Sequence, residues 1–308
     1  MVRTVLTPAK AANLAALMAG LLALIPAFRC WRLLRPTALR IIAVWLVLAV
    51  VSYVAAAAVY LADMSVAWVE AARIAAAVLT GALGVVVLGA RGPREAAWHV
   101  ILASYVLVVF FPVFEQAVTS RWQAGSRPAL DWLRVALLLL IAALTMANYA
   151  VSRLRYAVAA GSIGAAVQAM LASPWPIPSR DAFFAVSVLV VAGSLLSCSS
   201  LQLASAAGGP LDCRWRLFRD LWGIAWAFRI QERFNQEANR KGWRAWITWA
   251  EVVEPDDPVV RASAVELFES LVRRFATAEW FVGLCPHPDH PNADDDKTGA
   301  GRSDAGTC

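Results

Sequence analysis

Histidine and cysteine are the side chains that most often ligate metals or act as catalytic bases and nucleophiles, and the chain has three histidines and five cysteines. The densest group lies near the C-terminus, where Cys285, His287 and His290 precede an acidic end that finishes with Cys308. Zinc sites usually take pairs of ligands from two separate elements, and this Pro- and Asp-rich end supplies no second ordered pair. We therefore assign no metal and expect residues 283–308 to form a disordered acidic C-terminus.

The remaining candidates for acid–base or redox chemistry are scattered along the chain. The cysteines have no CxxC spacing, which predicts neither a disulfide framework nor a zinc ribbon. The third histidine is His99, which would form a catalytic pair with Glu95 only if a lipid headgroup bound beside both. The sequence therefore predicts no catalytic residue, no cofactor and no enzyme activity.

Charged residues that flank the apolar segments suggest a polar site. Glu70 and Arg73 open one apolar segment, Glu115 closes the next, and Asp131 precedes the one after. These four residues are candidates for lining an outward-facing polar pocket; the favoured interpretation is that they pair with one another or with lipid headgroups at the interface. No charged residue lies in the middle of a segment, which weakens an ion-coupled transporter.

The apolar residues that surround these groups are grouped into long runs. The chain is 60% hydrophobic with a mean hydropathy of +0.58, well above a soluble domain. Seven runs approach the length that crosses a bilayer, and several tryptophans lie at their ends. The predicted fold is all-α: a polytopic transmembrane helical bundle with about seven spans over residues 1–205, followed by a small, mainly helical cytoplasmic tail. The runs are 12–28, 41–62, 74–90, 97–118, 133–151, 157–173 and 182–204.

Arginines predict the orientation of this bundle. They follow the first, third and fifth runs, so these loops are expected to be cytoplasmic, with the N-terminus outside and the C-terminus inside. The run 157–173 is short and rich in small residues, and if it does not cross the membrane the tail changes sides. Such residues, including Gly161 here and Gly81 and Gly84 in the third run, predict tight helix packing. The high Arg and Ala content favours a bacterial cytoplasmic (inner) membrane.

The tail begins with RWRLFRDLWGIAWAFRIQERF at residues 214–234. Arg219 and Asp220 interrupt this stretch, so it is too short an apolar run for an eighth span. Plotted as a continuous helix, it has an apolar stripe opposite Arg216 and Arg219, which predicts an amphipathic helix that docks on both the membrane face and a second helix of the tail, and leaves surface for a partner protein. The interaction surface expected on it consists of Trp215, Leu217, Leu221, Trp222, Trp226 and Phe228.

The rest of residues 206–282 is expected to add a Trp-rich extended segment and a second helix. Asp257 is placed to cap that helix with Pro258 at its first position, and an apolar face recurs from Ala264 to Phe275. A unit this small buries little core alone, so we expect another protein to cover its apolar faces.

The leading functional prediction is a non-enzymatic membrane scaffold or complex subunit whose tail recruits a partner. The expected partners are the lipid bilayer and a membrane or cytoplasmic protein, and not nucleic acid, because the tail as a whole is acidic. One alternative is a permease or exporter for a neutral or lipophilic solute, with a cavity lined by Tyr105, Asn148 and Gln168. The other is a lipid-acting membrane enzyme or a sensor.

Overall fold

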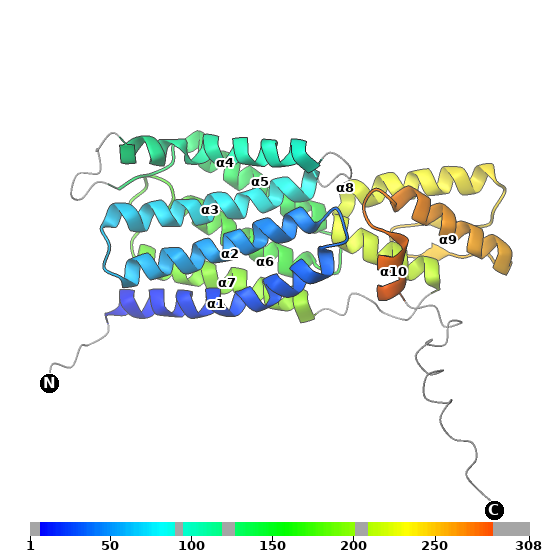
Figure 1. Cartoon of the computed structure of the whole chain (residues 1–308), viewed down its shortest axis with the longest axis horizontal. Coiled ribbons are helices and arrows are strands. Elements are labelled where there is room, and N and C mark those ends of the chain that lie inside the picture. Colours follow the sequence, from blue (N-terminus) through cyan, green and yellow to red (C-terminus); the bar gives the residue numbers. More distant parts are fainter. Residues whose placement is uncertain (1–6, 90–94, 119–126, 201–208, 286–308) are drawn as a thin grey trace, which may run out of the picture.

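The computed structural model describes residues 7–89, 95–118, 127–200 and 209–285. Seven helices lie side by side in one bundle, and a smaller group of helices continues from one end of it (Figure 1). The bundle helices are α1 (Pro8–Leu34), α2 (Arg40–Leu61), α3 (Val66–Gly89), α4 (Glu95–Val118), α5 (Trp132–Tyr149), α6 (Arg155–Leu171) and α7 (Arg180–Ser200).

Six described helices, all except α6 within the bundle, are long and apolar enough to cross a membrane. These lengths identify an integral membrane protein. The 17-residue α6 corresponds to about 25 Å of helix, slightly less than a typical hydrocarbon layer. It nevertheless packs along both α5 and α7.

Tight helix packing, predicted from the small residues, is confirmed. A methyl group added at Gly84 would lie 2.4 Å from the Thr145 hydroxyl of α5, and one at Gly164 would lie 2.8 Å from Val191 of α7. Buried polar side chains pair across helices, as when the Gln168 amide of α6 donates to the Ser187 hydroxyl of α7 at 2.6 Å. Because lipid provides no hydrophobic drive for helix association, these close approaches hold the bundle together.

The C-terminal module comprises residues 210–285. It contains α8 (Pro210–Arg240), a short antiparallel hairpin of β1 (Trp246–Ile247) and β2 (Val252–Val253), α9 (Pro258–Val272) and α10 (Ala278–Leu284). Two local predictions are confirmed: the Trp-rich segment contributes the hairpin, and Asp257 caps α9, accepting from the Val259 backbone N–H at 2.8 Å with Pro258 at the first position.

The expectation that this module buries little core is wrong. Its aromatic side chains form a continuous buried cluster that also takes in the corner between α1 and α2. Phe218 stacks on Trp222 with ring centroids 4.9 Å apart, and Phe275 packs edge-on against both. The sequence predicted only two helices for this module, whose apolar faces would be partly open. In the structure α10 covers them together with Leu34, Leu39 and Ala43 of the bundle. The module therefore needs no second protein to form its core.

The C-terminal end of the module corrects a second prediction. Cys213 of α8 and Cys285, which follows α10, form a disulfide with Cα atoms 5.9 Å apart. The segment after α8 folds back over this helix and brings the two cysteines together. Their spacing in the sequence matches no disulfide motif, so the sequence did not predict the bond. Residues 283–285, expected to be part of the disordered end, form the last turn of α10 and its C-cap. Residues 286–308, including His287, His290 and Cys308, lie outside the described part of the chain.

Candidate functional site

The interaction surface predicted on α8 is not exposed in this fold. Trp215, Leu217, Trp222 and Trp226 are buried in the core of the module, and Leu221 is partly buried against it. Phe228 is the exception, with 59% of its surface exposed. The prediction fails because the helical plot assumed one continuous helix on a membrane, whereas α8 is the central element of the module and is covered from several sides.

α8 bends at Gly223, and the residues on both sides of the bend contact the bundle (Figure 1). Gly223 has φ +70° and ψ −174°, a conformation that residues with a side chain adopt at considerable cost. The end of α5 satisfies the backbone on both sides of the break: the Tyr149 hydroxyl donates to the Leu221 carbonyl at 2.8 Å, and the Asn148 Oδ1 accepts from the Ala225 N–H at 3.0 Å. Asn148 thus acts as a cap for the second half of a helix in another element.

Charged groups reinforce this junction. The buried Asp220 carboxylate accepts from the Arg153 backbone N–H of the α5–α6 turn at 3.3 Å and from Arg219 at 3.0 Å. Arg219 also donates to the Trp249 carbonyl at 2.7 Å. Because each buried charge has an opposite charge or a carbonyl beside it, arginines that resembled a solvent-facing stripe are stable inside the module.

A further arginine of α8 is held within the module. Burial lowers the pKa of the Arg214 guanidinium, while Glu269 and Glu254 oppose this effect by favouring its charged form. The Arg214 Nε lies 3.2 Å from the Glu269 carboxylate of α9. The basic face of α8 is therefore largely used in internal ion pairs instead of contacts with lipid headgroups.

A second attachment joins the module to the corner between α1 and α2. The Ala38 N–H donates to the Phe275 carbonyl at 2.7 Å, and Thr37 pairs with Ala276 in an antiparallel bridge. The Trp280 indole N–H of α10 donates to the Leu33 carbonyl at 2.9 Å. Together with the contacts at the α5 end and the α5–α6 turn, these bonds fix the module at three places on the bundle.

The second half of α8 presents an exposed, mainly polar face. Two neighbouring hollows of about 430 and 460 Å³ lie on it and share Glu232 and Gln236 in their walls. Phe228 lines the first, and Arg229 and Arg233 line the second. Aromatic side chains are enriched in protein–protein interfaces, which makes this face a candidate docking surface.

The end of the bundle farthest from the module carries a polar pocket, here called the distal pocket. Its volume is about 470 Å³, and Glu70 and Arg73 of α3 line it together with Arg180 and Asp181 at the start of α7. Arg73 pairs with Asp181 at 2.5 Å and with Glu70 at 3.5 Å, and Arg180 pairs with Glu70 at 3.4 Å. The Arg73 guanidinium also lies over the Phe184 ring, 4.8 Å from its centroid.

The predicted polar pocket is therefore brought together only in part. Glu115 is exposed on α4 and does not line the distal pocket. Asp131 instead caps α5, accepting from the Arg134 backbone N–H at 3.0 Å, and forms an ion pair with the Arg134 side chain. Arg180 and Asp181 lie more than a hundred residues after Glu70 and Arg73 in the sequence, and this separation gave no signal of the cluster.

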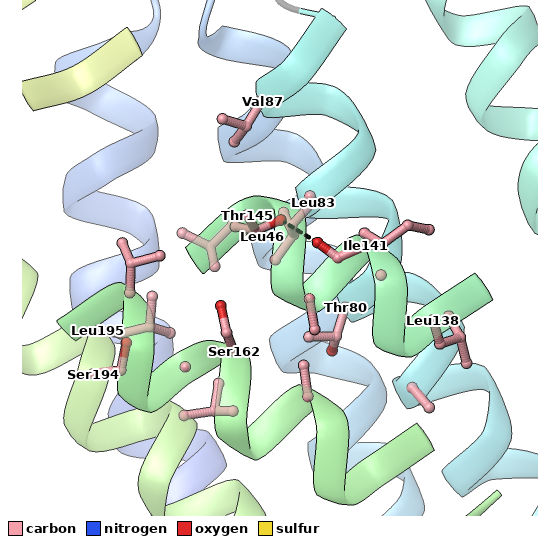
Figure 2. A pocket seen from close by; sticks show the side chains of 18 residues that line it. Leu46, Thr80, Leu83, Val87, Leu138, Ile141, Thr145, Ser162, Ser194 and Leu195 are labelled. Carbon is pink, nitrogen blue, oxygen red and sulfur yellow. Dashed lines mark hydrogen bonds between the residues drawn. The ribbon is translucent and has the colours of Figure 1, made fainter. Parts of the chain in front are cut away.

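A second cavity, called the bundle cavity, lies between α3, α5, α6 and α7. Its volume is about 150 Å³, and small residues such as Gly81, Gly161 and Ala165 contribute to its lining (Figure 2). The Ser162 hydroxyl points into the space and has no hydrogen-bond partner among the described residues, whereas Thr145 donates to the Ile141 carbonyl at 2.8 Å. The cavity is thus mostly apolar with one available hydroxyl.

The three deep polar residues expected to line a permease cavity do not line this one. The Tyr105 hydroxyl lies 3.4 Å from the Val78 carbonyl, Gln168 bonds to Ser187, and Asn148 belongs to the junction with α8. The possible catalytic pair stays a prediction: His99 is exposed on α4, and the Glu95 side chain lies outside the described residues. Within the described ranges no cluster of three metal-ligating side chains occurs.

Comparison with known proteins adds no assignment to this geometry: no family model, no curated protein and no solved structure matches the chain significantly.

Proposed function

We propose that the protein is a membrane scaffold or complex subunit that holds its C-terminal module at a fixed position beside the bilayer and docks a partner protein on it. The attachment of the module at three places on the bundle carries this proposal, because it sets the position and orientation of the module. The partner is proposed to bind the second half of α8, with Phe228 as the aromatic anchor and Arg229, Glu232 and Arg233 around it.

The proposed topology has seven spans, with the N-terminus outside and the module in the cytoplasm of a bacterial cell. Support for α6 as a span comes from its antiparallel packing: the Leu130 N–H beside α5 donates to the Ala172 carbonyl after α6 at 2.8 Å, so α6 covers the length of α5. Support for the orientation comes from Arg29, Arg32, Arg35, Arg40, Arg153 and Arg155, which flank the end that carries the module.

The disulfide favours the opposite orientation, because disulfides persist mainly in oxidising compartments. The proposed orientation rests on the arginine distribution, since it reflects insertion of the whole bundle, whereas the disulfide reflects a single pair of cysteines. Labelling of thiols in intact cells separates the two cases: a cytoplasmic module has Cys213 and Cys285 reduced and shielded from impermeant reagents.

The docking proposal is tested by co-purification in mild detergent with two matched variants. Phe228→Ser removes the exposed aromatic side chain of α8, and Val259→Ser removes a comparably exposed apolar side chain, 72% accessible, at the start of α9. A partner lost with Phe228→Ser and kept with Val259→Ser supports the proposal. Equal retention in both variants contradicts docking on this face.

A second candidate function, transport or binding of a small neutral lipophilic molecule, is favoured by the bundle cavity alone. A cavity of about 150 Å³ is large enough for a benzene-sized molecule, and apolar cavities of that size bind such ligands. Ala165→Leu fills the cavity, whereas Ala103→Leu adds the same group on the exposed face of α4. Loss of xenon or benzene binding with Ala165→Leu only supports this function, and no binding to the unaltered protein refutes it.

A further inference from the structure

The distal pocket has more hydrogen-bond donors than acceptors. Arg73 and Arg180 each keep a buried Nε–H that has no partner, although their remaining nitrogens contact carboxylate, amide or carbonyl oxygens. The Arg73 side chain is more than nine-tenths buried. A buried donor without an acceptor is costly, so the arrangement favours an additional acceptor inside the pocket.

The charges around the pocket show the same imbalance. Glu70 and Asp181 are paired with Arg73 and Arg180, and Asp63 is paired with Lys10 at the rim with 2.9 Å between the charged atoms. Arg127 also lines the pocket, and no carboxylate within the described ranges pairs with it. Three arginines and Lys10 face three carboxylates, which leaves one positive charge for a ligand.

The walls of the pocket are only partly polar. Met64, Val66 and Val69 line it beside the charged groups, and Met64 and Val66 are each almost half exposed at the end of the bundle. A ligand that fits both parts carries one negative charge and an adjoining apolar group. Its oxygens would meet the arginines, for which paired N–H donors and a planar shape suit carboxylate and phosphate.

We propose that the distal pocket binds a monoanionic amphiphile through its oxyanion, a carboxylate or a phosphodiester, with the exposed Arg127 and the mostly buried Arg180 as the cationic contacts. This inference is independent of the docking proposed for the module, which lies at the other end of the bundle (Figure 1). A carboxylate would come from a soluble solute and a phosphodiester from a lipid headgroup.

The test uses the full chain in nanodiscs of phosphatidylcholine, titrated with hexanoate, and compares these discs with ones that also contain phosphatidylglycerol. Saturable hexanoate binding identifies a soluble carboxylate site, and preferential retention of phosphatidylglycerol in native mass spectrometry identifies a headgroup site; either outcome supports the proposal. Absence of both overturns it.

Variants separate this site from general attraction of anions to a basic surface. Arg127→Gln and Arg180→Gln each weaken the observed binding by about tenfold, as expected for loss of one charge-assisted hydrogen bond. Arg134→Gln removes an arginine at the same end of the bundle that does not line the pocket, and leaves binding unchanged. Equal effects of Arg127→Gln and Arg134→Gln would overturn the proposal even if a probe binds. Because the Arg127 side chain is exposed, its replacement should not unfold the protein, so weaker binding by this variant reports on the pocket.

Discussion

Replacing Gly223 by alanine is expected to destabilise the junction between the bundle and the module. The new Cβ would lie 2.3 Å from the Asn148 Nδ2 and 2.7 Å from the Asn148 carbonyl oxygen. The backbone conformation costs a residue with a side chain about 1–3 kcal/mol, and the overpacking adds about 1–3 kcal/mol. Gly223→Ala should therefore lower the free energy of unfolding by about 2–6 kcal/mol.

Two other glycines of the module serve as matched controls. Gly242 has a similar φ of +71° but open space around its Cβ position, so Gly242→Ala should cost only the backbone term, about 1–2 kcal/mol. Gly283 lies in α10 with no atom within 4 Å and no unusual φ, and Gly283→Ala should be neutral or stabilise by up to about 1 kcal/mol. The difference between the losses of unfolding free energy caused by Gly223→Ala and Gly242→Ala measures the contact of Gly223 with α5.

Tryptophan fluorescence during denaturant or thermal unfolding measures these effects, because seven of the fourteen tryptophans lie in the module. A double-mutant cycle with Asn148→Ala adds a second criterion: removing the Asn148 side chain relieves the closest clash, so Gly223→Ala should cost at least about 1 kcal/mol less in that background. If Gly223→Ala is no more destabilising than Gly242→Ala, or if the two changes are additive, the junction described here is incorrect.

Three further changes test the module and the bundle. Asp220→Asn leaves Arg219 without its buried carboxylate and should lower the free energy of unfolding by about 3–5 kcal/mol. Glu237→Gln, in the exposed pair with Arg240, should change it by no more than about 0.5 kcal/mol. Unfolding curves that agree for the two variants would contradict the buried pair. Reducing the Cys213–Cys285 disulfide in oxidised purified protein should cost about 4 kcal/mol, given the 72-residue separation, and Cys213→Ser should abolish this response while Cys30→Ser preserves it. In calorimetry, Gln168→Leu should lower the stability of the bundle by about 1–3 kcal/mol because the Ser187 hydroxyl loses its buried donor, and an unchanged midpoint would argue against that hydrogen bond.

The helical segments of the bundle were predictable because their signal is local. A run of apolar residues with charges and tryptophans at its ends specifies a helix without reference to any other part of the chain. The cap of α9 is equally local, since Asp257, Pro258 and the apolar face all lie within one short stretch. Each of these features depends on neighbours in the sequence.

The form of the module was not predictable in the same way. The bend in α8 depends on Asn148, which contacts Ala225 across 77 positions, and a helical plot cannot include it. The charges of α8 resembled a solvated stripe because some of their partners lie in later segments: Glu269 pairs with Arg214, and the Trp249 carbonyl accepts from Arg219. For the same reason the i,i+3 pair of Glu70 and Arg73 was visible in the sequence, while Arg180 and Asp181 were not associated with it.

The measurement that tests the scaffold proposal most directly is photo-crosslinking in native membranes, with benzoylphenylalanine placed at position 228 and, as the control, at position 259. Both side chains are exposed on the module, but only the first lies on the proposed docking face of α8. The proposal predicts one discrete crosslinked protein from position 228 and none from position 259. No crosslink from position 228, or the same products from both positions, would contradict it.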